Sequence, residues 1–445
     1  MNRSRIDSYQ NHPYWWDSGP DDQPINLDRL ATPANEIPLQ ADCVVVGAGY
    51  TGLSAALTLA RAGRSVTVLD ESQPGYGCSG RNGGLIGPSF HKLGLDGLKA
   101  RLGETKANAI MRESMDILLW LKQFISHEGI ECGLIEAGRF RGAVTHKFYG
   151  ELARQAETLE KVVDLAYEMI PESEQRGHIG SDFYKGGIVY HQDGHLHPGL
   201  FLKGLANLAL EAGAKIFAPA RVKQIESIDN GYRVKLEEAS IRCGEVMIAT
   251  NGYTDPNFPY LRRRVIPLRS AIISTEPLSP DLMRELSPRQ HGFGDTGRLV
   301  TYYRPSSDGT RMVFGGRAFN QADRPENYTR DLHRLMTRIF PQLRETGISH
   351  AWSGTVAYTF DHAPHIGRVP EGAMAGAHYA MGYCGSGVGR ATWFGRKAAL
   401  KILGDPEGST PLDHLTFETR PLYSGNPWFL PAILRWHNLL DRFGY

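Results

Sequence analysis

The sequence lacks a long hydrophobic run and is poor in cysteine. No stretch of about 18 consecutive apolar residues occurs, so no transmembrane helix is expected. The N-terminal residues are polar, and they lack the apolar core of a secretory signal peptide. The five cysteines are scattered, and no two of them form a C-x-x-C pair. This pattern argues against a disulfide framework and against a metal site, and a reducing, cytoplasmic location is expected.

An excess of charge of one sign is also absent. Lys and Arg total 49 and Asp and Glu total 48, which leaves a net charge of +1. This balance gives no reason to expect nucleic acid or an anionic membrane as a partner. With 445 residues, 41% of them hydrophobic, the chain suits a globular protein of two or three domains. The sequence does not specify an oligomeric state.

A dinucleotide fingerprint lies near the N-terminus. The apolar run at 42–46 is typical of a buried parallel strand, and CVVVGAGYTG places Gly47, Gly49 and Gly52 directly after it. The Ala- and Leu-rich residues 53–62 predict a helix that ends at Gly63. In this motif the first glycine permits a tight turn, the second lets the backbone approach a pyrophosphate, and the third lets helix and strand pack closely. The alternative is a chance glycine-rich turn.

An acidic residue supports the fingerprint. The second predicted strand, 65–69, leads into Asp70, which lies 23 residues after Gly47. A carboxylate there accepts hydrogen bonds from the hydroxyls of an adenosine ribose and disfavours a 2′-phosphate. Glu71 is the alternative occupant of that role. The fingerprint by itself does not distinguish NAD from FAD, but similar features return at 244–252 and 382–400, which suits a long cofactor contacted by distant segments.

Hydrophobic periodicity predicts the remaining elements. Helical spacing occurs at 105–126, 148–169, 198–211, 328–340 and 391–403. Strands are expected at 188–190, 215–217, 220–225, 232–237 and 244–249, followed by alternating runs at 265–275, 299–304 and 312–315 that suggest an antiparallel sheet.

The two ends of the chain are set apart by their aromatic residues. The first 38 residues form an irregular arm, expected to pack on the body through Tyr14, Trp15 and Trp16. In the tail, the spacing of Trp428, Phe429, Leu430, Ile433, Trp436 and Leu440 suggests an amphipathic helix. It is expected to dock on the core, and a partner or a membrane surface is the alternative.

Several stretches together resemble the D-amino-acid-oxidase-like superfamily of FAD-dependent amine oxidoreductases. The chain is most similar to its bacterial branch that includes γ-glutamylputrescine oxidoreductase. The resemblance covers roughly residues 40–405. It rests on GAGYTGLSAALTLARAG (47–63), GCSGRNGG (77–84), DGHLHP (193–198), ATNGYT (249–254), RPSSDGTRMVFGGR (304–317), WSGTVAYTFDHAPHIG (352–367) and GYCGSGVG (382–389).

The resemblance implies an α/β fold with two interleaved domains. A Rossmann-like FAD-binding domain would comprise 39–90, 186–258 and 350–405. A substrate domain built on an antiparallel sheet would comprise 91–185 and 259–349, and residues 406–445 would form a tail. The stretch TVAYTFD (355–361) has no cysteine where some relatives attach FAD covalently, so non-covalent FAD is implied.

The resemblance and the residue chemistry together assign a cofactor site. The GCSGRNGG loop would border the pyrophosphate and the flavin ring. The amides of Gly382–Gly389, which precede a helix, would face the flavin N1–C2=O region, where negative charge develops on reduction. The cofactor-binding candidates are Gly47, Gly49, Tyr50, Thr51, Gly52, Asp70, Glu71, Gly77, Cys78, Ser79, Arg81, Asn82, Gly83, Gly84, Val222, Thr250, Asn251, Gly354, Gly382, Gly385, Ser386, Gly387 and Val388.

The catalytic candidates are Tyr302, Arg304, Asp361 and His362. Strand alternation puts Tyr302 and Arg304 on one face and Tyr303 on the other, without deciding which face meets the flavin. Arg269 and Arg317 are further candidates for an anionic substrate end. For each of these residues, packing is an equal alternative. His195 and His197 are interpreted as structural residues of a turn.

The implied reaction is oxidation of a C–N bond of an amine or N-substituted amino acid to an imine. Hydride would pass to flavin N5, the imine would be hydrolysed, and oxygen or another acceptor would reoxidise the flavin. The cofactor supplies the chemistry, so no catalytic triad is expected. The alternatives are an NAD-dependent dehydrogenase and a non-catalytic flavin-binding protein.

Overall fold

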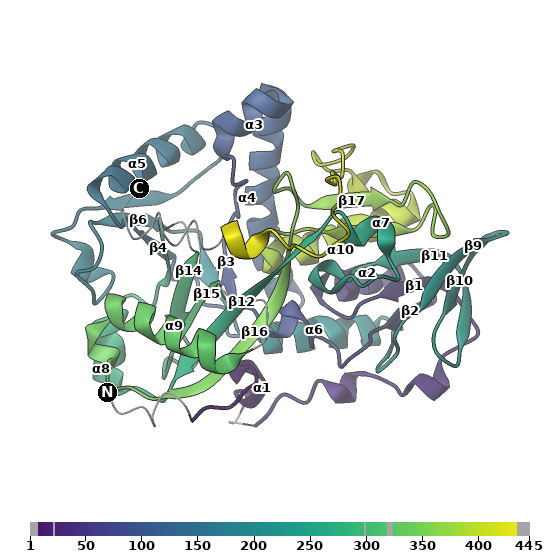
Figure 1. Ribbon diagram of the computed structural model, residues 1–445, viewed down its shortest axis with the longest axis horizontal. Helices are drawn as coiled ribbons and strands as arrows, with labels where there is room; N and C mark the ends of the chain where they lie inside the picture. The colour runs from purple at the N-terminus through teal and green to yellow at the C-terminus, as the bar shows by residue number, and fades with distance from the viewer. Residues whose placement is uncertain (1–7, 21–22, 298–299, 318–323, 434–445) are drawn as a thin grey trace.

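The computed structural model describes residues 8–20, 23–297, 300–317 and 324–433. Two large sheets lie side by side, each with its own helices, and long strands run between the two halves (Figure 1). The N-terminal arm passes along the base of both halves. This arrangement confirms the expected α/β class with a mixed and an antiparallel-rich sheet.

The first sheet has the order β17-β18-β11-β1-β2-β8, with β10 and β9 attached to β11. Its central pairs, β18–β11–β1–β2–β8, are parallel, as expected for strands that read as continuous apolar runs. Its strands are β1 (Gln40–Val46), β2 (Val66–Leu69), β8 (Lys215–Phe217), β9 (Gln224–Ile228), β10 (Gly231–Lys235), β11 (Ser240–Ile248), β17 (His365–Arg368) and β18 (His378–Met381).

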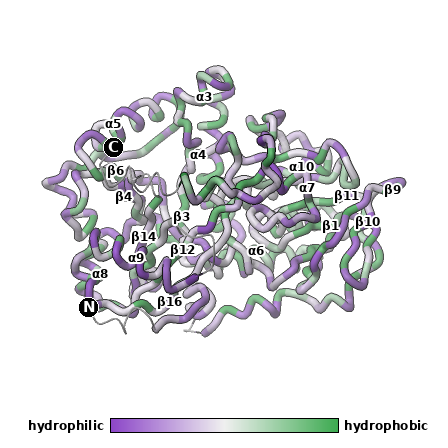
Figure 2. The backbone as a smooth tube through the Cα atoms, viewed as in Figure 1, coloured by the Kyte–Doolittle hydropathy of each residue, from purple (hydrophilic) through white to green (hydrophobic). Residues whose placement is uncertain are grey.

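Helices cover one face of the first sheet. The largest apolar cluster joins its strands to α2 (Tyr50–Arg61), α4 (Glu104–His127), α6 (Pro198–Glu211) and α10 (Gly387–Leu403). A second cluster fills the opposite face under β9 and β10. The hydropathy colouring shows apolar residues gathered around β1 and β11, with hydrophilic residues toward the tip of β9 (Figure 2).

The second sheet has the order β16-β12-β15-β14-β13-β4-β6-β5. Its pairs are antiparallel except for β13 with β4. Helix α9 (Pro325–Ile339) packs on one of its faces. The strands are β4 (Arg139–Gly142), β5 (Tyr167–Ile170), β6 (Gly187–Tyr190), β12 (Ile266–Thr275), β13 (Gly292–Asp295), β14 (Thr301–Pro305), β15 (Met312–Arg317) and β16 (Ile348–Tyr358).

Short elements complete the fold. β3 (Leu85–Ile86) pairs with β7 (Gly194–His195). The remaining α-helices of the described chain are α1 (Tyr14–Asp17), α3 (Gly94–Leu102), α5 (His146–Glu160), α7 (Pro259–Arg262) and α8 (Pro280–Leu286). None of the helices in the described ranges is both long and apolar enough to cross a bilayer.

Three sequence expectations differ from the structure. The helix expected at 148–169 ends at Glu160, and residues 167–170 form β5, which hydrogen-bonds to β6. Residues 220–223 precede β9, because the Ala220 amide donates to the Asp70 carbonyl outside any strand ladder. Finally, β6 and most of β16 fall within the expected FAD-binding segments, yet both pair in the second sheet.

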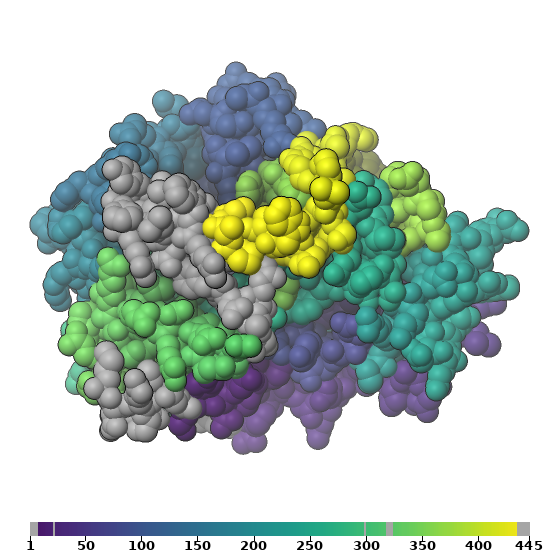
Figure 3. All heavy atoms as spheres, viewed as in Figure 1, coloured from purple at the N-terminus to yellow at the C-terminus, as the bar shows by residue number. Residues whose placement is uncertain are grey.

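The described parts of the N-terminal arm and of the C-terminal tail pack against the body. Tyr14 and Trp15 are buried, as expected for the arm. In the tail, Leu430 packs on Leu268, Tyr358 and Cys384, whereas Trp428 is 71% exposed. The described part of the tail, up to residue 433, crosses the visible face of the molecule between α9 and α7 (Figure 3, yellow). Trp436 and Leu440 lie outside the described residues.

Candidate active site

A cavity of about 390 Å³ runs between the two sheets, a volume within the range of small-molecule sites. Its walls come from the fingerprint turn, the 77–84 loop, the 220–222 and 249–255 segments, strands β12, β14 and β16, and the start of α10. Segments hundreds of residues apart in the chain therefore meet around one space.

Most cofactor candidates line this cavity. Of the cofactor candidates named from the sequence, Gly52 and Gly382 do not line it, and the others do. A Cβ on Gly52 would overlap the Gly47 carbonyl oxygen, so this glycine serves helix–strand packing, as the fingerprint predicts. Gly382 has φ +85° and its amide donates to Asn251 Oδ1 at 3.0 Å, which joins the two loops.

The fingerprint turn is held by the neighbouring loop. Gly47 has φ +108°, a conformation that glycine adopts without strain. A Cβ on Gly49 would lie 2.8 Å from Ser79 Oγ, and the Tyr50 amide donates to that same oxygen at 3.0 Å. The start of α2 and the GCSGRNGG loop are thus fixed to each other where a pyrophosphate is expected.

Asp70 lies at the end of the cavity that borders the first sheet. Its carboxylate accepts hydrogen bonds from the amides of Ala48 (2.7 Å) and Ser72 (3.0 Å). Burial raises the pKa of Asp70 to about 6, although these two hydrogen bonds oppose the shift. Glu71 is exposed and lies 3.5 Å from the guanidinium of Arg221, so Asp70 is the better placed of the two acids.

The GCSGRNGG loop is fixed mainly by the protein itself. Asn82 donates to the carbonyls of Cys78 and Ser79 and accepts from the Gly84 amide. Arg81 stacks on the rings of Trp16 and Tyr76 and donates to the carbonyls of Tyr76 and Ser353. The Arg81 side chain, one of the cofactor-binding candidates, is therefore held by neighbouring residues of the protein.

The start of α10 meets the same cavity. Ser386 is the N-cap residue but its side chain makes no capping hydrogen bond, so the first-turn amides of α10 are not capped by it. A Cβ on Gly387 would meet no atom within 4 Å. This open helix start offers a positive dipole end to a ligand.

The catalytic candidates separate into two groups. Tyr302 lines the cavity, and burial raises its pKa to about 12. Arg304, Asp361 and His362 do not line it. Arg304 is 1% exposed, and it donates to the carbonyls of Gly83, Leu196 and Pro305. As strand alternation predicts, Tyr302 and Arg304 share the face toward the 83–84 loop, while Tyr303 is buried in the opposite core.

Asp361 and His362 take part in local structure. The Asp361 carboxylate lies 3.1 Å from His365 Nε2 and accepts from the Ala363 amide. Burial acts to raise the pKa of Asp361, but the hydrogen bond and charge of His365 together with the hydrogen bonds from Ala363 and Thr359 outweigh it and lower that pKa. His362 has φ +60° and its ring packs edge-on to Tyr358. Both residues turn the chain between β16 and β17.

Other residues singled out from the sequence have structural roles. The His197 ring accepts from the Leu200 amide at the start of α6, and His195 Nε2 lies 3.0 Å from the Gln290 carbonyl. Arg269 donates to Ser353 Oγ. The side chain of Arg317 lies outside the described part of the structure. In the described ranges, one group has convergent ligand atoms of the kind that hold metals, His12 with Asp17 and His350, and it does not line the cavity.

Lys92, Arg139 and Tyr358 line the cavity and were not singled out from the sequence. Lys92 Nζ donates to the Tyr358 hydroxyl at 2.7 Å and lies over the Tyr358 ring. Arg139 forms a 2.9 Å ion pair with the buried Asp193. Lone basic residues in loops and strands carry no local pattern. Only the position of Tyr358 within the family-like stretch WSGTVAYTFDHAPHIG pointed to this region.

Comparison with known proteins identifies the family. The family model described as "FAD dependent oxidoreductase" matches residues 42–400. The chain belongs to this family. This membership decides between the two cofactors that the fingerprint allowed, and the cofactor is FAD.

Relatives and solved structures agree with this assignment. The chain is 32% identical over 373 residues to the gamma-glutamylputrescine oxidoreductase of Escherichia coli, covering 83% of this chain and 85% of that protein. It is 30% identical over 417 residues to a probable oxidoreductase OrdL of Haemophilus influenzae, covering 90% of each. The fold resembles the glycine oxidase of Geobacillus kaustophilus, with a TM-score of 0.69, 19% identity and coverage of 86% of this chain and 99% of that one.

The residues around the cavity fit FAD. The Asp70 carboxylate suits a ribose, the start of α2 suits a pyrophosphate, and the uncapped start of α10 suits the electron-rich edge of the flavin. A flavin between the 83–84 loop and the start of α10 would lie beside Tyr302 and Tyr358, both of which line that part of the cavity.

Proposed function

We propose that this FAD-dependent oxidoreductase oxidises a C–N bond of an amine or N-substituted amino acid to an imine, which water then hydrolyses. The observation that supports it is the shared cavity, in which the expected FAD contacts and a separate set of side chains, Lys92, Tyr302 and Tyr358, meet. Bound FAD supplies the electron acceptor for the hydride that leaves the α-carbon.

The protein's own residues orient the substrate. Tyr302 of β14 and Tyr358 at the end of β16 both line the cavity from the second sheet, in which β15 and β12 lie between their strands. The Tyr302 hydroxyl lies 3.0 Å from Ser270 Oγ, which fixes the ring. An aromatic wall can hold the neutral amine that donates its electrons and can also contact a cationic end of the substrate.

The charges at the two ends of the cavity differ. The lining carboxylates Asp70, Glu71 and Asp255 lie at the nucleotide end, where Glu71 and Asp255 pair with Arg221. Lys92 and Arg139 line the region near β3, β4 and Tyr358. Because Arg139 is paired with Asp193, the charge of Lys92 is the feature that supports an amine substrate carrying a carboxylate.

The five free cysteines support a reducing, cytoplasmic location as a further proposal. We infer that FAD is held without a covalent bond, since both thiols that line the cavity, Cys78 and Cys384, have pKa values raised by burial.

The test is anaerobic reduction of the bound flavin by a panel of amines and N-substituted amino acids, followed by admission of air. At least one class of amine is expected to abolish the flavin's visible absorbance. The ketone or aldehyde product should form in an amount equal to that of the flavin reduced. If no amine bleaches a fully loaded protein that dithionite does bleach, the chain binds flavin without oxidising amines and the proposal fails. The rate at which absorbance returns in air distinguishes oxygen from another acceptor.

A further inference from the structure

Three consecutive backbone carbonyls of the GCSGRNGG loop are held by side chains from three different elements. Trp352 Nε1 of β16 donates to the Arg81 carbonyl at 2.8 Å. Trp15 Nε1 of α1 donates to the Asn82 carbonyl at 2.8 Å. Arg304 Nε of β14 donates to the Gly83 carbonyl at 2.6 Å. We call Trp15, Trp352 and Arg304 the loop clamp.

The loop clamp is buried and internally packed. The exposed fractions are 0% for Trp15 and 1% each for Trp352 and Arg304. The two indole rings meet edge to face with centroids 5.9 Å apart, and the Arg304 guanidinium lies 4.7 Å from the centroid of the Trp15 ring. Each donor is fixed by its packing, and a buried acceptor left without its donor is costly. The loop therefore has little freedom to shift.

The amides of the loop remain available. Asn82 and Gly83 both line the cavity, and their backbone N–H groups donate to no other described residue. Their carbonyls, by contrast, are occupied by Trp15 and Arg304. Backbone amides in a fixed loop beside a cavity are suitable donors for a flavin or a phosphate.

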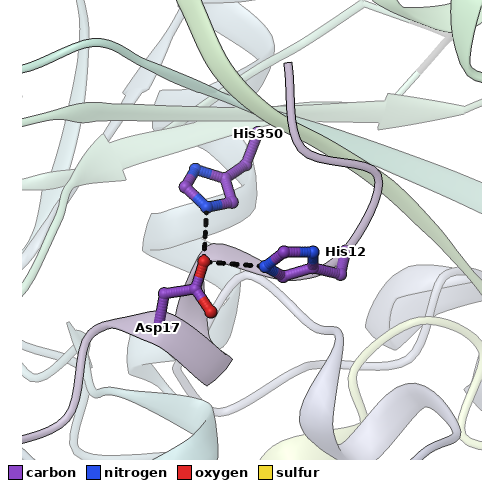
Figure 4. Close-up of side chains that lie close together, drawn as sticks. All are labelled: His12, Asp17 and His350. Carbon is purple, nitrogen blue, oxygen red and sulfur yellow. Dashed lines mark hydrogen bonds and ion pairs between the residues drawn. The ribbon is translucent and has the colours of Figure 1, made fainter. Parts of the chain in front are cut away.

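The arm that carries Trp15 is fastened to β16. Gln10 makes two backbone hydrogen bonds to this strand, with the Ser349 carbonyl and the Ala351 amide. Asp17 Oδ2 lies between two imidazoles, 2.7 Å from His12 Nε2 and 3.0 Å from His350 Nε2 (Figure 4). Burial would raise the pKa of Asp17, but the hydrogen bonds with His350 and His12 lower it, so the carboxylate stays ionised.

We propose that Trp15 of the N-terminal arm is a positioning residue of the FAD site, acting through the Asn82 carbonyl to fix the loop whose amides meet the cofactor. The inference rests on the proposed placement of FAD in the cavity. It gives the arm, which lies before the family match at 42–400, a role in cofactor binding.

A matched pair of variants tests this role. Trp15→Phe keeps an aromatic ring and removes the N–H that holds the loop. Trp16→Phe makes the same chemical change one residue later, where the indole N–H has no hydrogen-bond partner among the described residues. FAD affinity of the full-length apoprotein is measured by quenching of flavin fluorescence, together with the visible circular dichroism of the bound flavin and the thermal unfolding of the apoprotein.

We expect Trp15→Phe to weaken FAD binding by on the order of tenfold, as for loss of one buried hydrogen bond, and to change the flavin circular dichroism. Trp16→Phe should leave both unchanged. Equal FAD affinity in the two variants would overturn the proposal. A loss of FAD affinity in Trp15→Phe that is fully explained by a lower unfolding temperature of its apoprotein would also overturn it.

A second variant keeps the test decisive if Trp15→Phe does not fold. Asp17→Asn weakens the fastening of the arm at a partly exposed position, and it should raise the FAD dissociation constant in the same direction by a smaller factor. An unchanged constant would count against the proposal. These measurements concern FAD binding alone, so a protein that binds FAD but oxidises no amine would refute the proposed function and leave this inference intact.

Discussion

At the scale of single residues, the buried Asp70 carboxylate favours FAD binding but lowers the stability of the apoprotein. Its pKa is raised by burial from 3.8 to about 6. Between these two values the folded apoprotein binds more protons than the unfolded chain, so this group makes stability fall as pH rises from about 4 to about 6. Above that window the ionised carboxylate destabilises the apoprotein, by up to about 3 kcal/mol relative to low pH.

Asp70→Asn should therefore change the apoprotein in a pH-dependent way. The free energy of unfolding of the variant, relative to the natural chain, should rise between about pH 4 and 6 and then level off. The loss of one acceptor oxygen should weaken FAD binding roughly tenfold, at about 1–2 kcal/mol for the bond. Chemical unfolding at several pH values and FAD titration measure both, and a difference in unfolding free energy that does not vary with pH would contradict the assignment.

Lys92 permits a test of substrate charge. Lys92→Met keeps the length of the side chain and removes its charge beside Tyr358. For an amine that carries a carboxylate, the dissociation constant measured from anaerobic flavin reduction should rise about 10- to 100-fold, as expected for a lost charged hydrogen bond of about 1.5–3 kcal/mol. The dissociation constant of an amine without a carboxylate should be unchanged. Lys99→Met, which removes the half-buried partner of the exposed Glu104, is the control. Equal losses for both kinds of amine would refute the anionic substrate end.

At the scale of elements, the start of α10 gives a contrast between stability and binding. A side chain added at Gly387 meets open space, because this position faces the cavity. Gly387→Leu should thus leave the apoprotein as stable as before or more so, by up to about 1 kcal/mol from helix propensity. It should also abolish FAD uptake by occupying the space of the cofactor.

Gly150→Ala in α5 is the control for that change. A Cβ there meets only the Arg154 side chain at 3.5 Å, so the same gain in helix propensity is expected without any effect on FAD. Thermal unfolding and FAD titration of the two apoproteins separate the two effects. Full FAD loading of Gly387→Leu would place the flavin away from α10.

The elements also show how far the sequence could predict the fold. The helix α6 was predicted at 198–211 because Pro198 begins it and Gly213 follows it, and the structure has it at Pro198–Glu211. Residues 167–169 were assigned to a helix because the stretch 148–169 has helical spacing and few helix breakers, and only pairing with β6 makes them part of a strand. Similarly, most of β16 lies in the family-like stretch 352–367, which was assigned to the FAD-binding domain. Its pairing partner β12 lies more than 70 positions earlier, so the sequence around β16 does not show to which sheet it belongs.

Residues of the candidate site could be predicted where they belong to a motif of fixed local spacing, and not where they stand alone in the sequence. Glycine motifs such as Gly47 and Gly49 have fixed spacing and could be read directly from the sequence. Arg304 was a catalytic candidate with packing as an equal alternative, because a lone arginine on a strand has no feature that reveals its partners. In the structure it donates to carbonyls from a distant loop, and such contacts exist only after the two sheets meet.

At the scale of the whole molecule, the FAD cavity joins the two sheets. Leu69 and Val46 line it from the first sheet, and Leu268, Tyr302 and Val356 line it from the second. A ligand bound only to the folded state stabilises it by RT ln(1 + [L]/Kd), about 2.7 kcal/mol at a hundredfold excess over Kd. Non-covalent FAD should therefore raise the unfolding temperature of the apoprotein progressively with FAD concentration, in one transition that involves both halves.

Because FAD is held without a covalent bond, acid precipitation should release all of the flavin. A covalent link through Cys78 or Cys384 would need a thiolate, and burial raises the pKa of the Cys78 thiol to about 12 and that of Cys384 above its usual value. The precipitated protein should be colourless, with the full flavin absorbance in the supernatant, and Cys78→Ser and Cys384→Ser should behave in the same way. Flavin that stays in the pellet, and an unfolding temperature that does not depend on added FAD, would together establish a covalent bond.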